Sequence, residues 1–417
     1  MLRRRTLLGT TAPALALSAL AAPAIAQSRQ KISFLTWNLV DQEALIRRWI
    51  DAFQRANPGA EVEWLDKKGP ELPAFYQTQL AAGTPPDIIN TQGALWLEYA
   101  ANGALLDLSD RIKADAEMRT RFNAEYLSNW TYNERNFMVP FYITKTLLFY
   151  NKPLFQKAGL SGPPQSFDDI LAFAAKMAGP DSTGFLTLNF DWLYWPLFKM
   201  NGVELLTPDL AKPAFNTPKA IEVVEKLAAA SDTGAINKIS WTGRWVEPNG
   251  AFAAGNVGML HAHSPAYFFV KGQGNWVNSE TIGAAHAPGN WATPNSHGLG
   301  ISKGSKNPDL AYAFLKHLTG NEMAGMFANE RKILTGNTAV DQALLAKLAT
   351  EDPTLEKILR TQVEHTDRMT GNWRIAADAR VKDAFWPELQ NALLGRKTAR
   401  QALGDAERRV ARELSRS

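Results

Sequence analysis

The chain of 417 residues exceeds what one hydrophobic core usually supports, so we expect two domains or lobes. Hydrophobic residues make up 45% of it and charged residues 21%, which is typical of a soluble globular protein. It contains no cysteine, which excludes disulfides, a catalytic thiol and a lipid-modified cysteine.

The first 26 residues differ from the rest of the chain. Three arginines at positions 3–5 precede an apolar stretch over 15–22, and Ala24 and Ala26 are the small residues of a cleavage site. This order predicts a signal peptide, and Arg4-Arg5 resembles a twin-arginine export signal; a general-secretion signal is the alternative. The apolar stretch is too short to span a membrane. We therefore expect a soluble protein exported to the periplasm.

The net charge argues against nucleic acid as a partner. Removing the three N-terminal arginines lowers the formal charge from +4 to +1, and no other basic cluster occurs.

Strands and helices alternate along the first part of the mature chain, which predicts a mostly parallel sheet covered by helices on both faces. Asp41 is placed to cap the first helix. The expected elements are strands over 31–36, 60–65 and 85–89, and helices over 41–56, 72–82 and 94–101.

The stretch 137–159 is unlike its surroundings. Two short apolar runs, 137–143 and 147–150, flank the polar break Thr144-Lys145-Thr146. Both runs are rich in β-branched and aromatic residues, so they read as buried strands. Because no true turn separates them, we interpret the break as a crossing between two lobes.

The second half again predicts alternating elements, with Ser166 as a helix cap followed by acidic residues. Residues 271–298 are rich in Gly, Asn and Pro and read as loop. The expected elements are helices from Ser166 and over 192–200, 218–230, 308–318 and 399–414, and strands over 184–189, 257–261 and 298–302, with 338–417 mainly helical.

Seven blocks, in order, resemble the extracellular solute-binding protein family 1, the sugar-binding component of bacterial ABC importers. They include A-A-G-T-P-P-D-I-I over 81–89, Y-N-K-P-L-F-Q-K-A-G-L over 150–160 and G-L-G-I-S-K-G-S-K-N-P over 298–308. The others lie at 31–38, 103–108, 251–259 and 395–403.

This resemblance implies an α/β fold of two lobes, each a mostly parallel sheet flanked by helices, that close on a ligand by hinge motion. It implies crossings near 143–146, 297–301 and 330–336. We assign 27–142 plus 300–330 to lobe 1, and 143–299 plus 331–417 to lobe 2. The implied partners are a carbohydrate ligand and the permease subunits of an ABC transporter. We expect a monomer with no cofactor, no catalytic residue and no metal.

Candidate ligand contacts are aromatic, amide and charged residues near the ends of predicted strands. Trp49, Trp64 and Trp96 fall on core faces of their elements and are set aside, and Trp195 is assigned to packing. The candidates are Trp37, Asn38, Gln92, Asp191, Trp192, Trp241, Arg244, Trp245, His261, His263, Trp373 and Arg374.

The family usually has a tryptophan near position 265, where this chain has His263-Ser264-Pro265. This departure puts a conventional stacking platform in doubt and suggests a different or smaller ligand. His261 and His263 share one face of a strand, but no third ligand is close in sequence, so we expect no metal site.

Two alternatives stay open. Arg244 or Arg374 could hold an anionic polyol derivative, such as a glycerol phosphodiester or a sulfosugar. Gly300-Ile301-Ser302-Lys303-Gly304 fits the G-x-S-x-G motif of serine hydrolases, but Lys306-Asn307-Pro308 delays the helix that this motif requires.

Overall fold

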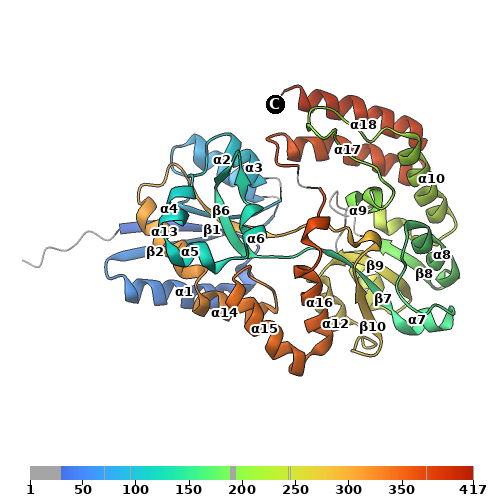
Figure 1. The fold of residues 1–417 in the computed structure, drawn as a ribbon, viewed down its shortest axis with the longest axis horizontal. Helices are drawn as coiled ribbons and strands as arrows, with labels where there is room; N and C mark the ends of the chain where they lie inside the picture. The colour runs from blue at the N-terminus through green and yellow to red at the C-terminus, as the bar shows by residue number, and fades with distance from the viewer. Residues whose placement is uncertain are drawn as a thin grey trace, which may run out of the picture.

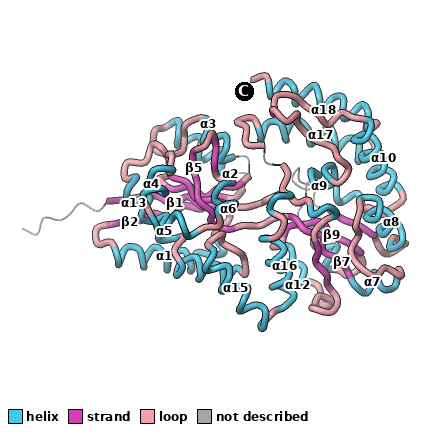
Figure 2. The backbone as a smooth tube through the Cα atoms, in the orientation of Figure 1, coloured by secondary structure: helices cyan, strands magenta, loops and turns pink. Residues whose placement is uncertain are grey.

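The computed structural model describes residues 30–416 except 70, 94, 188–193, 243, 245 and 372. Within this part, the chain forms two lobes, each built on one sheet, with the connecting segments between them (Figures 1 and 2). The expected two-lobe α/β fold is confirmed.

Lobe 1 contains a five-stranded sheet in the order β2-β1-β3-β11-β6. Strands β1, β2 and β3 are parallel, and β11 is antiparallel to both of its neighbours. The bounds are β1 Gln30–Trp37, β2 Ala60–Lys67, β3 Ile88–Gln92, β6 Met138–Tyr142 and β11 His297–Ile301.

Helices cover both faces of this sheet. Leu45, Trp49 and Phe314 pack on one face, and Leu72 and Trp96 on the other. The helices are α1 Glu43–Ala56, α2 Glu71–Ala81, α3 Leu95–Ala101, α4 Ser109–Ala114, α5 Ala116–Arg121, α6 Ala124–Ser128, α13 Pro308–Leu318 and α14 Asn321–Arg331. A 3-10 turn, Val40–Gln42, precedes α1, and a small hairpin joins β4 (Thr131–Tyr132) to β5 (Arg135–Asn136).

Lobe 2 contains a four-stranded sheet in the order β10-β7-β9-β8. Strand β7 is antiparallel to β9 and β10, and β8 is parallel to β9. The bounds are β7 Thr146–Asn151, β8 Thr183–Thr187, β9 Val257–His263 and β10 Ile282–Ala285.

Two hydrophobic clusters enclose the lobe 2 sheet. One includes Leu148, Phe385 of α17 and Val410 of α18; the other includes Phe149 and Ile358 of α16. The helices are α7 Lys152–Lys157, α8 Phe167–Met177, α9 Tyr194–Lys199, α10 Pro218–Asp232, α11 Val246–Ala253, α12 Ala266–Gln273, α15 Thr338–Glu351, α16 Pro353–Val363, α17 Asp378–Leu393 and α18 Ala399–Leu414, with 3-10 turns Lys238–Trp241, Pro288–Asn290 and Thr366–Arg368.

One strand in each sheet runs against the others, and the chain path explains why. Strands β7 and β11 are the ones that the chain enters directly from the other lobe. A strand entered from the interlobe side must begin where the neighbouring strands end, so its direction is reversed. The carboxyl ends of most strands in both lobes therefore face the space between them.

Three segments cross between the lobes and are joined by backbone hydrogen bonds. The N–H of Ile143 donates to the carbonyl of Leu334 (2.9 Å), and that of Asn295 donates to the carbonyl of Thr144 (2.8 Å). The crossings thus lie side by side as the hinge. Helix α17 of lobe 2 also lies near α3 of lobe 1, so the lobes approach one another away from the hinge as well (Figure 1).

Several sequence predictions need correction. We expected the second segment of lobe 1 to start at residue 300. Strand β11 begins at His297 and belongs to the lobe 1 sheet, so this segment starts three residues earlier. Asp41 does not cap α1, which starts at Glu43; its carboxylate pairs with Arg331. Strand β10 lies inside the expected loop, because the short run Ile282–Ala285 forms a strand by pairing with β7. Ser166 caps α8 as predicted, accepting from the N–H of Asp169 (3.0 Å).

Candidate ligand-binding cleft

A cavity of about 400 Å³ lies where the strand ends of the two lobes meet the hinge. Its volume is within the usual range for small-molecule sites. Both lobes and all three crossings contribute to its wall. The lining residues are Trp37, Asn38, Leu39, Gln92, Tyr142, Thr144, His263, Pro265, Asn295, His297, Phe327, Arg331 and Ile333.

The lobe 1 wall is held by Asp66, on the strand beside β1. One carboxylate oxygen of Asp66 accepts hydrogen bonds from the Thr36 hydroxyl (2.6 Å) and the Leu39 N–H (3.0 Å). The other oxygen accepts from the Val40 N–H (3.1 Å). These bonds fix the loop after Trp37, where Asn38 adopts a left-handed backbone conformation with φ of 53°. Trp37 and Asn38 therefore have a defined position at the cavity.

The hinge contributes an aromatic pair. The rings of Tyr142, the last residue of β6, and His297, the first residue of β11, stack with centroids 4.3 Å apart and an interplanar angle of 19°. Trp37 meets the His297 ring edge-on at 5.8 Å. Aromatic pairs in these arrangements attract one another beyond the effect of burial alone.

The lobe 2 wall includes His263, the last residue of β9, and His261 lies behind it on the same strand. His261 and His263 are almost completely buried, and burial lowers the pKa of His261 to about 3 and that of His263 to about 4. Burial, with a smaller contribution from His263, likewise lowers the pKa of His297 to about 3. All three imidazoles are therefore neutral at pH 7. No group of three potential ligands for a metal ion occurs among the described residues.

The cavity brings together four of the predicted contacts: Trp37, Asn38, Gln92 and His263. His261 is buried next to His263 on the same strand and does not line the cavity. Asp191, Trp192 and Trp245 lie outside the described residues.

The remaining predicted contacts do not line this cavity. Trp241 is fully buried in the lobe 2 core, where its indole N–H donates to the Ser231 hydroxyl (2.8 Å), so we no longer count it as a ligand contact. Arg244 is exposed and pairs with Glu247 (3.0 Å). Trp373 packs edge-on against Trp195 (5.0 Å), which is buried as predicted, and Arg374 is exposed.

Several residues that line the cavity were not predicted from the sequence. Tyr142 borders the predicted first crossing and Thr144 lies within it, so this position was the available signal for both residues. Asn295 and His297 fall in a stretch that was read as loop. Arg331, from the third crossing, is the one charged side chain among the described residues lining the cavity, and it pairs with Asp41 (2.6 Å).

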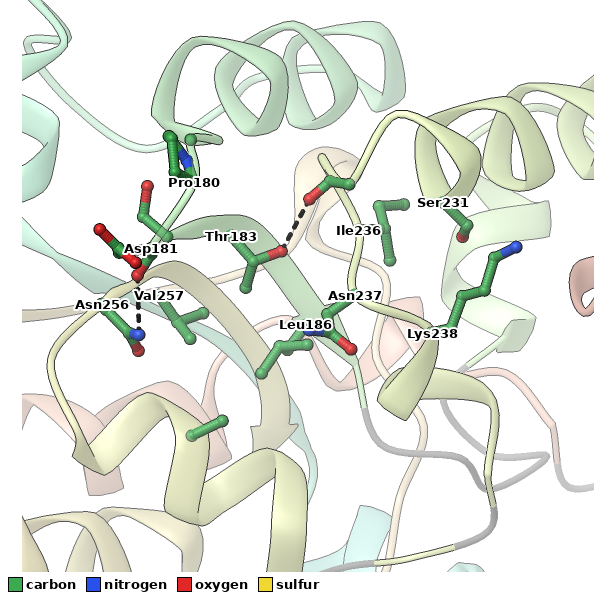
Figure 3. A pocket seen from close by; sticks show the side chains of 14 residues that line it. Pro180, Asp181, Thr183, Leu186, Ser231, Ile236, Asn237, Lys238, Asn256 and Val257 are labelled. Carbon is green, nitrogen blue, oxygen red and sulfur yellow. Dashed lines mark hydrogen bonds between the residues drawn. The ribbon is translucent and has the colours of Figure 1, made fainter.

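A second hollow, of about 530 Å³, lies within lobe 2 beside β8 (Figure 3). Its walls include Thr183 and Val257, the first residues of β8 and β9, which lie at the strand ends opposite the cleft. Two of its polar groups form hydrogen bonds with neighbouring residues. The Thr183 hydroxyl donates to the Gly234 carbonyl (3.0 Å), and the side-chain amide of Asn256 donates to the Asp181 backbone carbonyl (2.9 Å). Because one lobe forms this hollow, hinge closure would not alter it.

Ser302, the residue of the hydrolase motif, is 1% exposed. Its hydroxyl contacts the Tyr76 hydroxyl (2.8 Å) and donates to the Pro86 carbonyl. Helix α13 begins only at Pro308, so the strand–turn–helix geometry of a nucleophile elbow is not formed here.

Comparisons with known proteins agree with this architecture. A binding protein of Brucella abortus strain 2308 is 26% identical over 215 residues, so the alignment spans 50% of this chain and 52% of that relative. The diacetylchitobiose binding protein of Streptomyces coelicolor is 22% identical over 319 residues, or 71% of each chain.

A crystal structure of an ABC transporter solute-binding protein from Thermotoga lettingae, bound with α-D-tagatose, superposes with a TM-score of 0.78 at 20% identity. The match covers 92% of this chain and 100% of that one, which establishes the shared fold. The profile of the bacterial extracellular solute-binding proteins matches residues 36–325. The chain therefore belongs to the bacterial extracellular solute-binding protein family.

Proposed function

We propose that this protein captures an uncharged carbohydrate between its lobes and delivers it to the permease of an ABC transporter, without chemistry of its own. A sugar, sugar alcohol, glycoside or small oligosaccharide is the ligand class. The observation that carries this proposal is the cavity at the hinge, whose wall combines aromatic rings with amide, hydroxyl and neutral imidazole groups. Aromatic faces pack on the C–H faces of sugars, and the polar groups bind hydroxyls.

The charges of the described residues favour an uncharged ligand over the anionic alternative. Arg331 at the cavity is already paired with Asp41, and Arg244 and Arg374 do not line it. An anion would need a cation that is not committed to a carboxylate. The names of two similar proteins, which refer to diacetylchitobiose and tagatose, also support a carbohydrate.

A thermal-shift panel tests this proposal. The probes are N,N′-diacetylchitobiose, D-tagatose, maltose, sorbitol and, as the anionic comparison, glycerophosphoglycerol. A ligand at one hundred times its dissociation constant stabilises the folded state by about 2.7 kcal/mol and raises Tm by several degrees. A shift with a neutral probe supports the proposal. A shift with glycerophosphoglycerol alone would show that the ligand is an anionic polyol derivative and not a neutral carbohydrate. The absence of a shift with every probe would refute carbohydrate binding.

Export, a periplasmic location and a monomeric state complete the proposal. None of the helices within the described part of the chain combines the length and apolar character of a membrane span. The pattern of residues 1–26 supports export. Replacing Arg4 and Arg5 by lysine should abolish export if the twin-arginine route is used; light scattering measures the oligomeric state.

A further inference from the structure

The aromatic rings at the cavity are attached to the hinge. Tyr142 ends β6 immediately before the first crossing, and His297 begins β11 immediately after the second. A β-bulge between His297 and Gly298 breaks the pairing of these strands, so His297 pairs with Tyr142 while Gly298 pairs with Pro140. Bulges commonly redirect side chains near functional sites. Here the bulge coincides with the stacking of the two rings.

The three rings have different degrees of burial, which separates their roles. Trp37 and Tyr142 line the cavity and retain partial exposure, whereas His297 is only 6% exposed. His297 lies between them, stacked on Tyr142 and edge-on to Trp37. It therefore fixes the relative position of two rings that a ligand can reach.

The groups around these rings suit a neutral polyhydroxylated ring. Asn38 and Gln92 lie on the lobe 1 side, and Thr144 and Asn295 lie on the crossings. The Thr144 hydroxyl is committed to the Asn295 carbonyl (2.8 Å), which ties the two crossings together. Amide groups remain to bind hydroxyls at the edge of a sugar packed on the rings.

We propose that the hinge itself carries the stacking platform: Trp37 and Tyr142 contact the C–H face of a carbohydrate ring, and His297 is the positioning residue that holds them. This inference rests on the proposed carbohydrate function. The chain has His263-Ser264-Pro265 where the family usually has a tryptophan near 265. The rings at the hinge would provide the surface on which the sugar stacks instead. A ligand bound there touches residues that flank two crossings, so binding acts directly on the hinge.

The test measures the affinity of the full chain by calorimetry for the ring sugars N,N′-diacetylchitobiose, D-tagatose and maltose, and for the acyclic sorbitol. Tyr142→Leu should weaken the best ring sugar about tenfold, because it removes the ring but keeps apolar bulk. Tyr142→Phe should stay within about threefold of wild type, because the ring remains. The affinity for sorbitol should fall less than the affinity for the ring sugar, because an acyclic chain presents no ring face to the aromatic side chains.

His297→Leu should weaken the ring sugar as Tyr142→Leu does, and His297→Phe should restore binding, because it can stack on Tyr142. A merely structural role would not give this rescue. The matched control is Tyr312→Leu on α13, which removes a partly buried tyrosine that does not line the cavity.

The outcomes distinguish the platform from the function. If no carbohydrate binds wild type, the proposed function fails and the platform fails with it. If a ring sugar binds wild type and its affinity changes less than about threefold in both Tyr142→Leu and His297→Leu, the platform alone is overturned.

Discussion

The two walls of the cleft hold their polar groups differently. At the end of β1 in lobe 1, Asp66 accepts hydrogen bonds from Thr36, Leu39 and Val40. In lobe 2, His263 lines the cleft at the end of β9, and behind this wall neither ring nitrogen of the buried His261 has a hydrogen-bond partner among the described residues. The lobe 1 wall is thus organised by a charged acceptor, whereas the lobe 2 wall depends on imidazoles that stay neutral. The four predictions below test this contrast.

Acidification should destabilise the protein through lobe 2. The folded-state pKa of His261, about 3, lies below the 6.5 of the unfolded chain. Between these values the unfolded chain binds more protons, so stability falls as the pH falls below about 6.5. From pH 7 to pH 4 this residue alone accounts for about 3 kcal/mol of lost unfolding free energy. His261→Leu should remove that loss in urea unfolding measured at both pH values.

The control for this experiment is His365→Leu, at an exposed position, which should keep the acid sensitivity of wild type. Equal losses of stability in His261→Leu and wild type would show that the buried imidazole is not the cause.

Lys145, on the crossing between the walls, should also make stability rise with pH, but in the alkaline range. Burial lowers its pKa to about 8, below the 10.5 of the unfolded chain, against weaker opposing effects of Glu364 and Asp367. The unfolded chain binds more protons between pH 8 and 10.5, so stability contributed by this site rises with pH in that window. Lys145→Met should remove a rise of about 2 to 3 kcal/mol and be more stable than wild type at pH 7.

Chemical denaturation at pH 7, 8.5 and 10 measures this effect, with the exposed Lys157→Met as control. The same pH dependence in Lys145→Met and wild type would contradict the assignment.

Removing the charged acceptor of lobe 1 should have a smaller effect. Asp66→Ala leaves the Leu39 and Val40 N–H groups and the Thr36 hydroxyl without their acceptor, which should cost about 2 kcal/mol of unfolding free energy. Ligand affinity should also fall, because the loop that carries Asn38 loses its anchor. Asp66→Asn retains one acceptor oxygen, so its unfolding free energy and ligand affinity should lie between those of wild type and Asp66→Ala. If Asp66→Ala matches wild type in both measurements, the lobe 1 wall is not organised as described.

The smallest effect is expected at Arg244, outside both walls. Its side chain is 66% exposed and its ion pair with Glu247 is solvated, so Arg244→Ala should change the unfolding free energy by less than about 0.5 kcal/mol. Affinity for the best neutral carbohydrate should also be unchanged. A tenfold loss of affinity for glycerophosphoglycerol in this variant would instead favour the anionic ligand class.

Sequence patterns were sufficient where one local periodicity decides the structure. Helix α18 was predicted with the bounds that the structure shows, Ala399–Leu414, because its apolar face repeats with helical spacing. Trp37, Asn38 and Gln92 were found at the cavity because strand ends in such sheets form binding sites.

Patterns failed where the structure depends on contacts distant in sequence. The proximity of Tyr142 and His297 follows from pairing of β6 with β11 and from a bulge, neither of which leaves a local signal. Trp241 was predicted at the cleft because it lies in a polar segment close to Arg244. In the structure, its ring faces the core and its N–H finds Ser231 on α10.

The interleaved chain path has a consequence for the order of folding during synthesis. Strand β11 lies between β3 and β6, so the lobe 1 sheet stays split until the chain has been made past residue 301, after most of lobe 2. The core of lobe 2 in turn includes Val410. Each lobe therefore can complete its core only after part of the other lobe has been synthesised. Such non-local contacts slow folding and leave unpaired strand edges exposed while the chain grows.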